Sequence, residues 1–486
     1  MNRVRIALTA SVALSMLTAA AFTPTSFKDA SKIKSWDAWS DHEKQAAITN
    51  ILQKEKRSVT WEKFNKVDPG LREIGRITPR TSAEIKSSKW SVDCGTLDRD
   101  YAIWDNYKDL LPMLGVKHAR FCSGWAKTEQ EKGVYDFAWL DKPIRECAAM
   151  GIKPWMLVGY GNPVWGSDFR LGMRVRQLTG NAEAMAAWMR YVKTLVARYQ
   201  DVVDGWEVWN EPFRQENDYA ELFFQTAKAI REVQPAARVY CAAMSDFPQY
   251  EVVLERLKRE DAIGLCSGLM FHPYIPNPDN TYRGKKDAWM QLRRLAKRYS
   301  PDLDMIQGEV GVPTQLEFAH ALENREWSEY KQAKYDLRRA FGDAVRDVPS
   351  NCFSFIDLQY TFMLQSFGLV RSNTLMEFVY RRPSWYAMRN FYALFDDETK
   401  PVSFEERPVE GHALAIATFR RGGKTMKAFW FSEEIPTDSL AFTRLDLSKD
   451  VKAGAEWIEM VTGRRYRLDD AARVPVWDSP CLVVQD

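Results

Sequence analysis

The stretch GWEVWNEP, residues 205–212, is a short apolar run that ends in an asparagine, a glutamate and a proline. Its tryptophans and Val208 indicate a buried β-strand, because aromatic and β-branched side chains are favoured in strands. Glu207, Asn210 and Glu211 are too polar for a buried strand unless each of them has a partner or a function. The stretch therefore predicts a strand whose end carries polar, chemically useful side chains.

The same pattern repeats on both sides of this stretch. Short apolar runs alternate with longer amphipathic segments of helical period, such as residues 181–199 and 287–299. The strand candidates are residues 91–97, 116–124, 152–160, 203–211, 238–245, 268–275, 304–312 and 352–359.

Eight strands that alternate with helices predict an α/β protein with a (β/α)₈ TIM barrel. An open, doubly wound parallel sheet is the alternative. That fold normally has a glycine-rich phosphate loop after its first strand, whereas CGTLDRD (residues 94–100) contains one glycine and does not match such a loop. The barrel is therefore the favoured interpretation.

The N-terminus has the pattern of an export signal. Arg3 and Arg5 precede an apolar run, residues 6–21, which ends in three alanines. A positively charged N-terminal region, a short apolar region and small residues at the cleavage site are typical of a cleavable signal peptide. We therefore expect cleavage near Ala21 and export to the periplasm or the extracellular space, with a buried N-terminal helix as the alternative.

Composition and hydrophobic pattern divide the remaining chain into three parts. Residues 22–88 are polar and rich in lysine and glutamate, which predicts an N-terminal helical extension. Residues 89–396 contain the strand–helix alternation, and their last helix is expected over 383–395, with proline at its start. Residues 397–486 contain short alternating strands between glycine, proline and aspartate turns, which predicts a small β-sandwich.

Composition excludes several classes of partner. The chain of 486 residues has 68 basic and 65 acidic side chains, a net charge of +3, which is too balanced for a nucleic-acid or membrane-surface protein. No later segment is long and apolar enough for membrane insertion. The seven cysteines are scattered and form neither a CxxC motif nor a Cys/His cluster, so no disulfide framework and no metal site are predicted.

The polar residues at the strand ends carry the functional prediction. Active sites of such barrels form at the C-terminal ends of the strands. The fourth strand candidate ends in Asn210-Glu211 and the seventh ends near Glu309, almost opposite each other around the ring. Two carboxyls across one pocket are the requirement for cleavage of a glycosidic bond, and a separation of about 5 Å is the geometry that retains anomeric configuration.

These residues carry a resemblance to a known group of enzymes. WNEP (209–212), together with the second glutamate in QGEVG (307–311), resembles the retaining glycoside hydrolases of the 4/7 barrel clan, clan A. Residues 114–165 are similar to the corresponding region of families 39 and 42 and of relatives of family 5. FHPY (271–274) is similar to the His-x-Tyr of the sixth strand in that clan. The resemblance covers roughly residues 90–395.

The resemblance implies a role for each matching residue. Glu211 would be the general acid/base, Glu309 the nucleophile, and Asn210 the partner of the sugar 2-hydroxyl. No metal and no organic cofactor are implied.

Further positions complete the implied site. Tyr274 and Arg120 would keep Glu309 ionised and correctly aimed, because a cation and a hydrogen-bond donor lower the pKa of a carboxyl. His272 would line the same wall of the pocket. The remaining substrate-binding candidates lie at the ends of other strands: Trp125, Asn162, Trp165 and Gln359.

The eighth strand departs from the clan. Several clan members have a tryptophan at its end, beneath the sugar, whereas this chain has FIDLQY, residues 355–360. Gln359, Tyr360 or an aromatic residue of a loop is expected to replace it.

The sequence thus predicts an exported retaining glycosidase that cleaves β-glycosidic bonds of oligo- or polysaccharides by double displacement. Two alternatives use the same scaffold: a non-catalytic carbohydrate-binding protein, and a transglycosylase with the same residues.

Overall fold

The computed structural model describes residue 40 and residues 58–167, 175–283 and 288–486. The predicted signal peptide, residues 1–21, and most of the predicted extension lie outside the described residues. Residues 59–486 form one compact unit. No helix among the described residues is long and apolar enough to cross a membrane.

Eight parallel strands form a closed barrel, and this confirms the predicted (β/α)₈ fold. Each strand pairs with the next along the chain, and the last pairs with the first through Trp90 and Ser350, so no open sheet edge remains. The strands are β2 (Trp90–Asp93), β3 (His118–Cys122), β4 (Lys153–Val158), β5 (Gly205–Val208), β6 (Arg238–Cys241), β7 (Gly268–Phe271), β8 (Met305–Val310) and β9 (Ser350–Cys352).

The prediction for the eighth barrel strand was wrong in position. The expected strand was 352–359, whereas β9 ends at Cys352. The chain then leaves the barrel, and Leu358–Gln359 (β10) pairs with Leu364–Gln365 (β11) in a hairpin. The run CFSFI continues past Cys352 with apolar residues on both sides of Ser354, so its pattern contains no mark of the point where barrel pairing stops.

Helices surround the barrel, and short helices lie within the loops that connect its strands. The α-helices are α3 (Val59–Phe64), α4 (Leu111–Leu114), α5 (Trp125–Thr128), α6 (Ala138–Ala149), α7 (Val175–Thr179), α8 (Ala182–Tyr199), α9 (Glu216–Val233), α10 (Phe247–Arg259), α11 (Ala288–Tyr299), α12 (Glu329–Val345) and α13 (Pro383–Leu394). The short 3₁₀ helices are η3 (Leu97–Arg99), η4 (Trp104–Asn106), η5 (Lys108–Leu110), η6 (Pro163–Trp165), η7 (Ile263–Leu265) and η8 (Pro278–Tyr282). Local signals set several boundaries: the Asn181 side chain accepts hydrogen bonds from the first turn of α8, and Pro383 begins α13 as predicted.

The C-terminal part is an antiparallel sheet with a smaller second layer. Seven strands pair in the order β1-β19-β18-β21-β16-β15-β14, and β17 pairs with β20. The strands are β1 (Arg72–Arg76), β14 (Lys400–Val409), β15 (His412–Arg421), β16 (Lys424–Phe431), β17 (Thr443–Leu445), β18 (Ala455–Glu459), β19 (Arg464–Leu468), β20 (Val474–Val476) and β21 (Cys481–Gln485). Leu414 and Ile416 pack with Leu445 of the second layer, which is the predicted sandwich.

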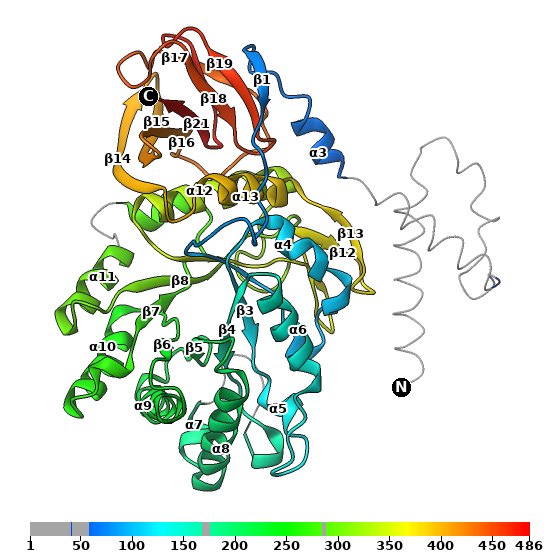
Figure 1. The fold of residues 1–486 in the computed structure, drawn as a ribbon, viewed down its shortest axis with the longest axis vertical. Helices are drawn as coiled ribbons and strands as arrows, with labels where there is room; N and C mark the ends of the chain where they lie inside the picture. The colour runs from blue at the N-terminus through cyan, green and yellow to red at the C-terminus, as the bar shows by residue number, and fades with distance from the viewer. Residues whose placement is uncertain (1–39, 41–57, 168–174, 284–287) are drawn as a thin grey trace. The chain divides into compact units, whose positions relative to one another are not determined.

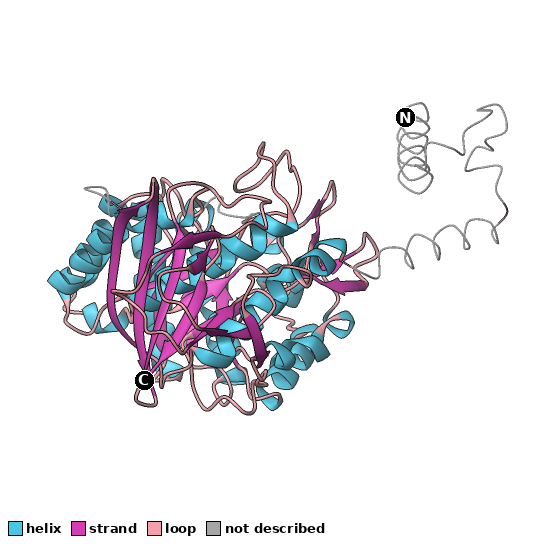
Figure 2. Cartoon of the chain, turned by 90° about the horizontal axis from the view of Figure 1, so that it is seen from above, coloured by secondary structure: helices cyan, strands magenta, loops and turns pink. Residues whose placement is uncertain are grey.

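The opposite face of this sheet packs on the barrel domain. Ala415 and Ala417 alternate with the residues that face the second layer, and they belong to the same core as the barrel. Helices α12 and α13 lie between the sheet and the barrel (Figure 1). Figure 2 shows the long strands of the sheet side by side.

Helix α12 is buried on nearly all sides because it lies between the barrel and the C-terminal sheet. Its residues 332–345 are all buried, charged ones included. Lys334 donates hydrogen bonds to the carbonyls of Thr437 and Ser439 and to Asp478, at 2.8, 2.5 and 2.6 Å. These contacts fasten the sheet to the barrel domain.

The extension before the barrel is not mainly helical where the structure describes it. Within residues 58–88, α3 is the one α-helix, and β1 adds an edge strand to the C-terminal sheet through pairing with β19. The polar β1 sequence, REIGR, has no strand signature of its own. It becomes a strand because an open sheet edge offers it hydrogen bonds. A further small hairpin is formed by β12 (Val370–Ser372) and β13 (Phe378–Arg381).

Candidate active site

Arg120, in the middle of β3, is the centre of a buried network of acids at the C-terminal end of the barrel. Its Nε and Nη2 donate hydrogen bonds to the two oxygens of Glu207, at 2.9 and 3.1 Å. Nη2 also donates to Asn210 Oδ1 at 2.9 Å. Nη1 donates to Asp93 at 3.3 Å and to Glu309 Oε2. The guanidinium is thereby fixed from several strands, and it orients the residues at their ends.

Glu309 lies near the end of β8, and its carboxylate is held from two sides. The Tyr274 hydroxyl donates to Oε1 at 2.7 Å, while Arg120 donates to Oε2. Burial by itself would raise the pKa of Glu309, but the positive charges of His272 and Arg120 and the hydrogen bond from Tyr274 outweigh it. The pKa of Glu309 therefore lies below its usual value, and the carboxylate is ionised at neutral pH.

Glu211 follows β5 in an unusual backbone conformation. Trp209 and Glu211 both have positive φ, 69° and 48°, the left-handed region that non-glycine residues rarely adopt. Such conformations persist where surrounding structure imposes them, and they are frequent at functional sites. The turn carries the Glu211 carboxylate to His272, whose Nδ1 lies 2.7 Å from Oε1.

The two glutamates meet across one small space. One oxygen of Glu211, one oxygen of Glu309 and a ring nitrogen of His272 lie within 4.8 Å of one another. The Glu211 side chain is 28% exposed and that of Glu309 13%, whereas Arg120 is 3% exposed. A ligand can therefore reach the carboxyl pair from the solvent side, while Arg120 stays beneath it.

The acids around this pair have shifted pKa values. Burial raises the pKa of Asp93 to about 6, although Arg120 opposes the shift, and burial also raises the pKa of Glu207. Burial would lower the pKa of His272, but the negative charge of Glu309 and the hydrogen bond to Glu211 raise it above its usual value. Clusters of coupled, buried titratable groups are typical of active sites.

Glu211, His272 and Glu309 are also the described residues whose ligand atoms are close enough for a metal ion. Their surroundings suit an ion poorly. Glu309 already receives a donor on each oxygen, and one of these donors is the permanently charged Arg120. A divalent cation there would face a fixed positive charge.

Three predicted substrate contacts are corrected by the structure. Trp125 and Asn162 have almost no exposed surface, at 0% and 1%. Trp125 Nε1 and Trp165 Nε1 both donate to the carboxylate of Glu129, at 2.6 and 3.0 Å, and Asn162 donates to the Glu129 carbonyl at 2.7 Å. Lys132 lies 4.2 Å from the centre of the Trp165 ring. These residues stabilise the loops after β3 and β4 and have no free surface for a sugar.

Gln359 is also displaced from its expected place. It lies in the β10–β11 hairpin, beyond the barrel strand, and its Nε2 donates to the Tyr360 carbonyl at 2.7 Å. The residue directly after β9 is Phe353, whose amide donates to the carbonyl of Val310, next to Glu309. Phe353 is therefore the aromatic residue at the end of the eighth strand. It was not predicted, because the strand was expected to end at residue 359.

Asp93 and Glu207 belong to the site more closely than the sequence indicated. Asp93 is the last residue of β2, so the rule for strand ends would have found it. Glu207, which is fully buried in β5, has its partner in Arg120.

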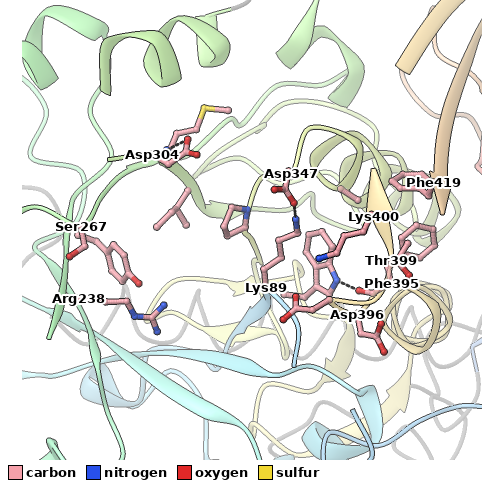
Figure 3. Close-up of a pocket in the computed structure, with 17 residues that line it drawn as sticks. Lys89, Arg238, Ser267, Asp304, Asp347, Phe395, Asp396, Thr399, Lys400 and Phe419 are labelled. Atoms are coloured by element: carbon pink, nitrogen blue, oxygen red, sulfur yellow. Dashed lines mark hydrogen bonds and ion pairs between the residues drawn. The ribbon is translucent and has the colours of Figure 1, made fainter. Parts of the chain in front are cut away.

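A cavity of about 470 Å³ lies at the other end of the barrel (Figure 3). Residues at the starts of strands line it, among them Trp90, Arg238 and Met305. Many of its charged groups are paired: Lys89 with Asp347, Arg238 with Asp204 and Asp304 with Arg293. The N-terminal end of such barrels serves stability, and the paired charges agree with that role.

Among the comparisons with known proteins, only the solved structures bear on the architecture. No family model matches the chain, and no curated protein matches it. Among solved structures, a family 39 glycoside hydrolase from the gut symbiont Bacteroides cellulosilyticus is similar, with a TM-score of 0.62 and 18% identity over 84% of this chain and 83% of that one.

Two further structures have the same arrangement. The family 39 enzyme from Xanthomonas axonopodis pv. citri has a TM-score of 0.52 and 16% identity over 85% of this chain and 97% of that one. A family 30 endoxylanase from Clostridium papyrosolvens has a TM-score of 0.51 and 13% identity over 86% and 99%.

At these identities the likeness establishes the fold. The chain has the barrel-and-sheet architecture of clan A glycoside hydrolases, and the expected resemblance to family 39 is confirmed at that level. The three structures named above are glycoside hydrolases of families 39 and 30.

Proposed function

We propose that this protein is a retaining glycoside hydrolase that cleaves β-glycosidic bonds of oligo- or polysaccharides. The observation that carries the proposal is the carboxyl pair: oxygens of Glu211 and Glu309 approach within 4.8 Å, on strand ends that face each other across the barrel. A separation near 5 Å leaves room for the anomeric carbon between two carboxyls, but not for an additional water on the opposite face.

In the first step Glu309 attacks the anomeric carbon and Glu211 protonates the leaving oxygen. The two donors on Glu309 keep it ionised and aim its oxygens. The bond to the leaving sugar breaks as the glycosyl–Glu309 ester forms, and the proton of Glu211 goes to the departing hydroxyl.

In the second step Glu211, now ionised, takes a proton from water. The resulting hydroxide attacks the anomeric carbon, and Glu309 leaves as a carboxylate. Two inversions give net retention. His272, at 2.7 Å from Glu211, holds this carboxyl in place while its charge changes.

Asn210 has its amide orientation set by the network. Its Oδ1 accepts a hydrogen bond from Arg120 at 2.9 Å, so its Nδ2 is the atom available to a ligand. We assign this donor to the sugar 2-hydroxyl, because hydrogen bonds at that position strengthen in the transition state.

The experiment is a product analysis on a panel of aryl β-glycosides and polysaccharides. Xylose-based substrates come first, because one structural neighbour is an endoxylanase. Proton NMR is expected to show the β-anomer of the product before mutarotation. An α-anomer would contradict the retaining mechanism, and transfer to added sugars in place of water would indicate a transglycosylase. Sugar binding by calorimetry without turnover of any substrate would identify a carbohydrate-binding protein.

Tyr274→Phe is expected to move the acidic limb of the kcat/KM profile to higher pH. The hydroxyl donates to the ionised form of Glu309 and helps to lower its pKa, so its removal raises that pKa. A shift of about one pH unit corresponds to loss of one hydrogen bond to a charged group. The measurement is kcat/KM from pH 3 to 8 on an aryl glycoside.

Tyr335→Phe is the matched control. This buried tyrosine donates to the carbonyl of Ile275 at 2.9 Å and not to a carboxylate, so its profile should keep the wild-type limb. If the acidic limb of the kcat/KM profile stays in place in Tyr274→Phe, or shifts to lower pH, then ionisation of Glu309 does not determine that limb.

A further inference from the structure

Arg99, in η3 after the first barrel strand, is a buried cation without hydrogen bonds. Its side chain is 9% exposed, and its one ionic contact is with Asp98, at 3.4 Å from Nε. Among the described residues none accepts a hydrogen bond from its guanidinium, and Nε and Nη1 are buried without a partner. A guanidinium has five N–H donors, and a buried set left unpaired costs stability. A ligand that accepts hydrogen bonds from these N–H groups would explain why the buried Arg99 side chain has no hydrogen-bond partner in the part of the chain that the structure describes.

Aromatic rings hold Arg99 at the mouth of the barrel. The centre of its guanidinium lies 5.4 Å from the Tyr101 ring and 5.3 Å from the Tyr160 ring. The Tyr160 ring in turn lies 5.6 Å from that of Trp209, two residues before Glu211. Ring contacts therefore connect Arg99 to the turn that carries Glu211, although Arg99 belongs to a different loop.

A row of rings continues from Tyr101 towards the solvent. The Tyr360 ring lies 4.3 Å from Tyr101 and 4.4 Å from His320, and Phe362 lies 5.7 Å from His320 in a stacked orientation. Phe362 is 66% exposed. We call Tyr101, His320, Tyr360 and Phe362 the aromatic shelf. It joins the loops that follow β2, β8 and β9, the first, seventh and eighth barrel strands.

The shelf lies on the side of the nucleophile. Glu309 belongs to β8, whereas Glu211 follows β5, on the opposite side of the ring. Burial raises the pKa of Tyr360; the Arg99 cation opposes this shift, and the carboxylate of Glu309 adds to it. The acid/base faces the leaving group, so a ligand on the shelf side belongs to the part of the substrate that stays bound to Glu309.

We propose that Arg99 and the aromatic shelf form a subsite for a second sugar on the non-reducing side of the cleaved bond. The inference rests on the proposed function and narrows its substrate: the protein acts on chains of two or more sugars before the scissile bond, and not only on terminal single sugars. The exposed Phe362 and the half-buried Tyr101 and His320 offer ring faces to the apolar face of a sugar, while the buried Tyr360 packs against Tyr101 and His320 and supports them. The guanidinium of Arg99 donates to hydroxyl and ring oxygens.

The test compares substrates that differ by one sugar. The probes are 4-nitrophenyl β-xyloside against β-xylobioside, and β-glucoside against β-cellobioside. For wild-type protein, kcat/KM is expected to be at least about tenfold higher on the longer member of the active pair. Arg99→Met and Phe362→Ala are each expected to lose about tenfold on the longer substrate and little on the shorter one.

Phe378→Ala is the matched control, because Phe378 is 42% exposed on β13 and makes no ring contact with the shelf. Its ratio of the two kcat/KM values should equal that of wild type. Thermal melting separates a binding defect from misfolding in Arg99→Met, and the exposed Phe362 provides a variant that leaves the core intact.

The outcomes separate the two proposals. An active protein that prefers the shorter substrate, or variants with an unchanged ratio, would overturn the subsite and leave the hydrolase intact. A wild-type protein inactive on every glycoside would overturn the hydrolase. Calorimetry with xylobiose and cellobiose then decides on the subsite: weaker binding in Phe362→Ala than in wild type supports it, and equal or absent binding overturns it.

Discussion

Glu309→Gln is expected to lower kcat/KM on an aryl β-glycoside by about 10⁴- to 10⁶-fold, the range found when a catalytic nucleophile is removed. The amide has nearly the shape of the carboxylate but cannot form the ester intermediate. In the wild-type protein, Arg120 and Tyr274 each donate a hydrogen bond to one oxygen of the ionised Glu309. In the variant these two donors face a neutral amide. The measurement is steady-state turnover with the released phenol as the readout.

Glu317→Gln is the control for this variant. Glu317 is buried in the loop that follows the same strand, and its Oε1 accepts hydrogen bonds from Ser366 at 2.6 and 2.7 Å, which an amide oxygen can also accept. It should keep wild-type turnover. Azide added to Glu309→Ala should yield a glycosyl azide of the opposite anomer, because azide enters from the face that the carboxylate vacates. Near-normal turnover in Glu309→Gln would refute the assignment of the nucleophile.

Glu211→Ala is expected to affect substrates according to their leaving groups. General acid catalysis contributes about 10²- to 10⁴-fold, and a poor leaving group needs the proton most. Turnover of an oligosaccharide or a simple phenyl glycoside should fall by this amount. A 2,4-dinitrophenyl glycoside should still form the intermediate, so that its later hydrolysis, which lacks a base, limits the rate.

Azide distinguishes this variant from the nucleophile variant. It needs no base, so it should restore turnover of the dinitrophenyl glycoside by Glu211→Ala and give a glycosyl azide with the anomer of the substrate. Glu221→Ala is the control, an acid on α9 that pairs with Arg256 at 3.0 Å, away from the site. An equal loss on good and poor leaving groups would assign the proton to another residue.

The catalytic candidates were predictable because they obey a positional rule. Asn210, Glu211 and Glu309 stand at the ends of apolar runs, and parallel strands present those ends at one rim of a barrel. His272 and Tyr274 follow the same rule, whereas Arg120 lies in the middle of β3, and the structure brings all of them together. The predictions failed where a residue type was favoured without knowledge of its burial, as for Trp125 and Trp165, whose indole nitrogens both bind Glu129.

Other misses concern pairing partners that are far away in the chain. The strand-like pattern after Ser350 continues to Ile356, so only the neighbouring strands decide that barrel pairing ends at Cys352. The polar segment of β1 becomes a strand because β19, nearly 400 residues later, has a free edge, and no local pattern records this. The shelf of rings likewise joins three loops that are distant in sequence.

The sequence by itself determined the class of fold and the identity of the carboxyl pair, because the alternation of strands and helices and the residues at strand ends are local patterns. Only the tertiary structure decided the distance between the carboxyls, the five-residue hydrogen-bond network around Arg120 and the unpartnered donors of Arg99. The physical reason is that distances, burial and hydrogen-bond satisfaction depend on which distant segments pack together, and periodicity along a chain does not contain that information.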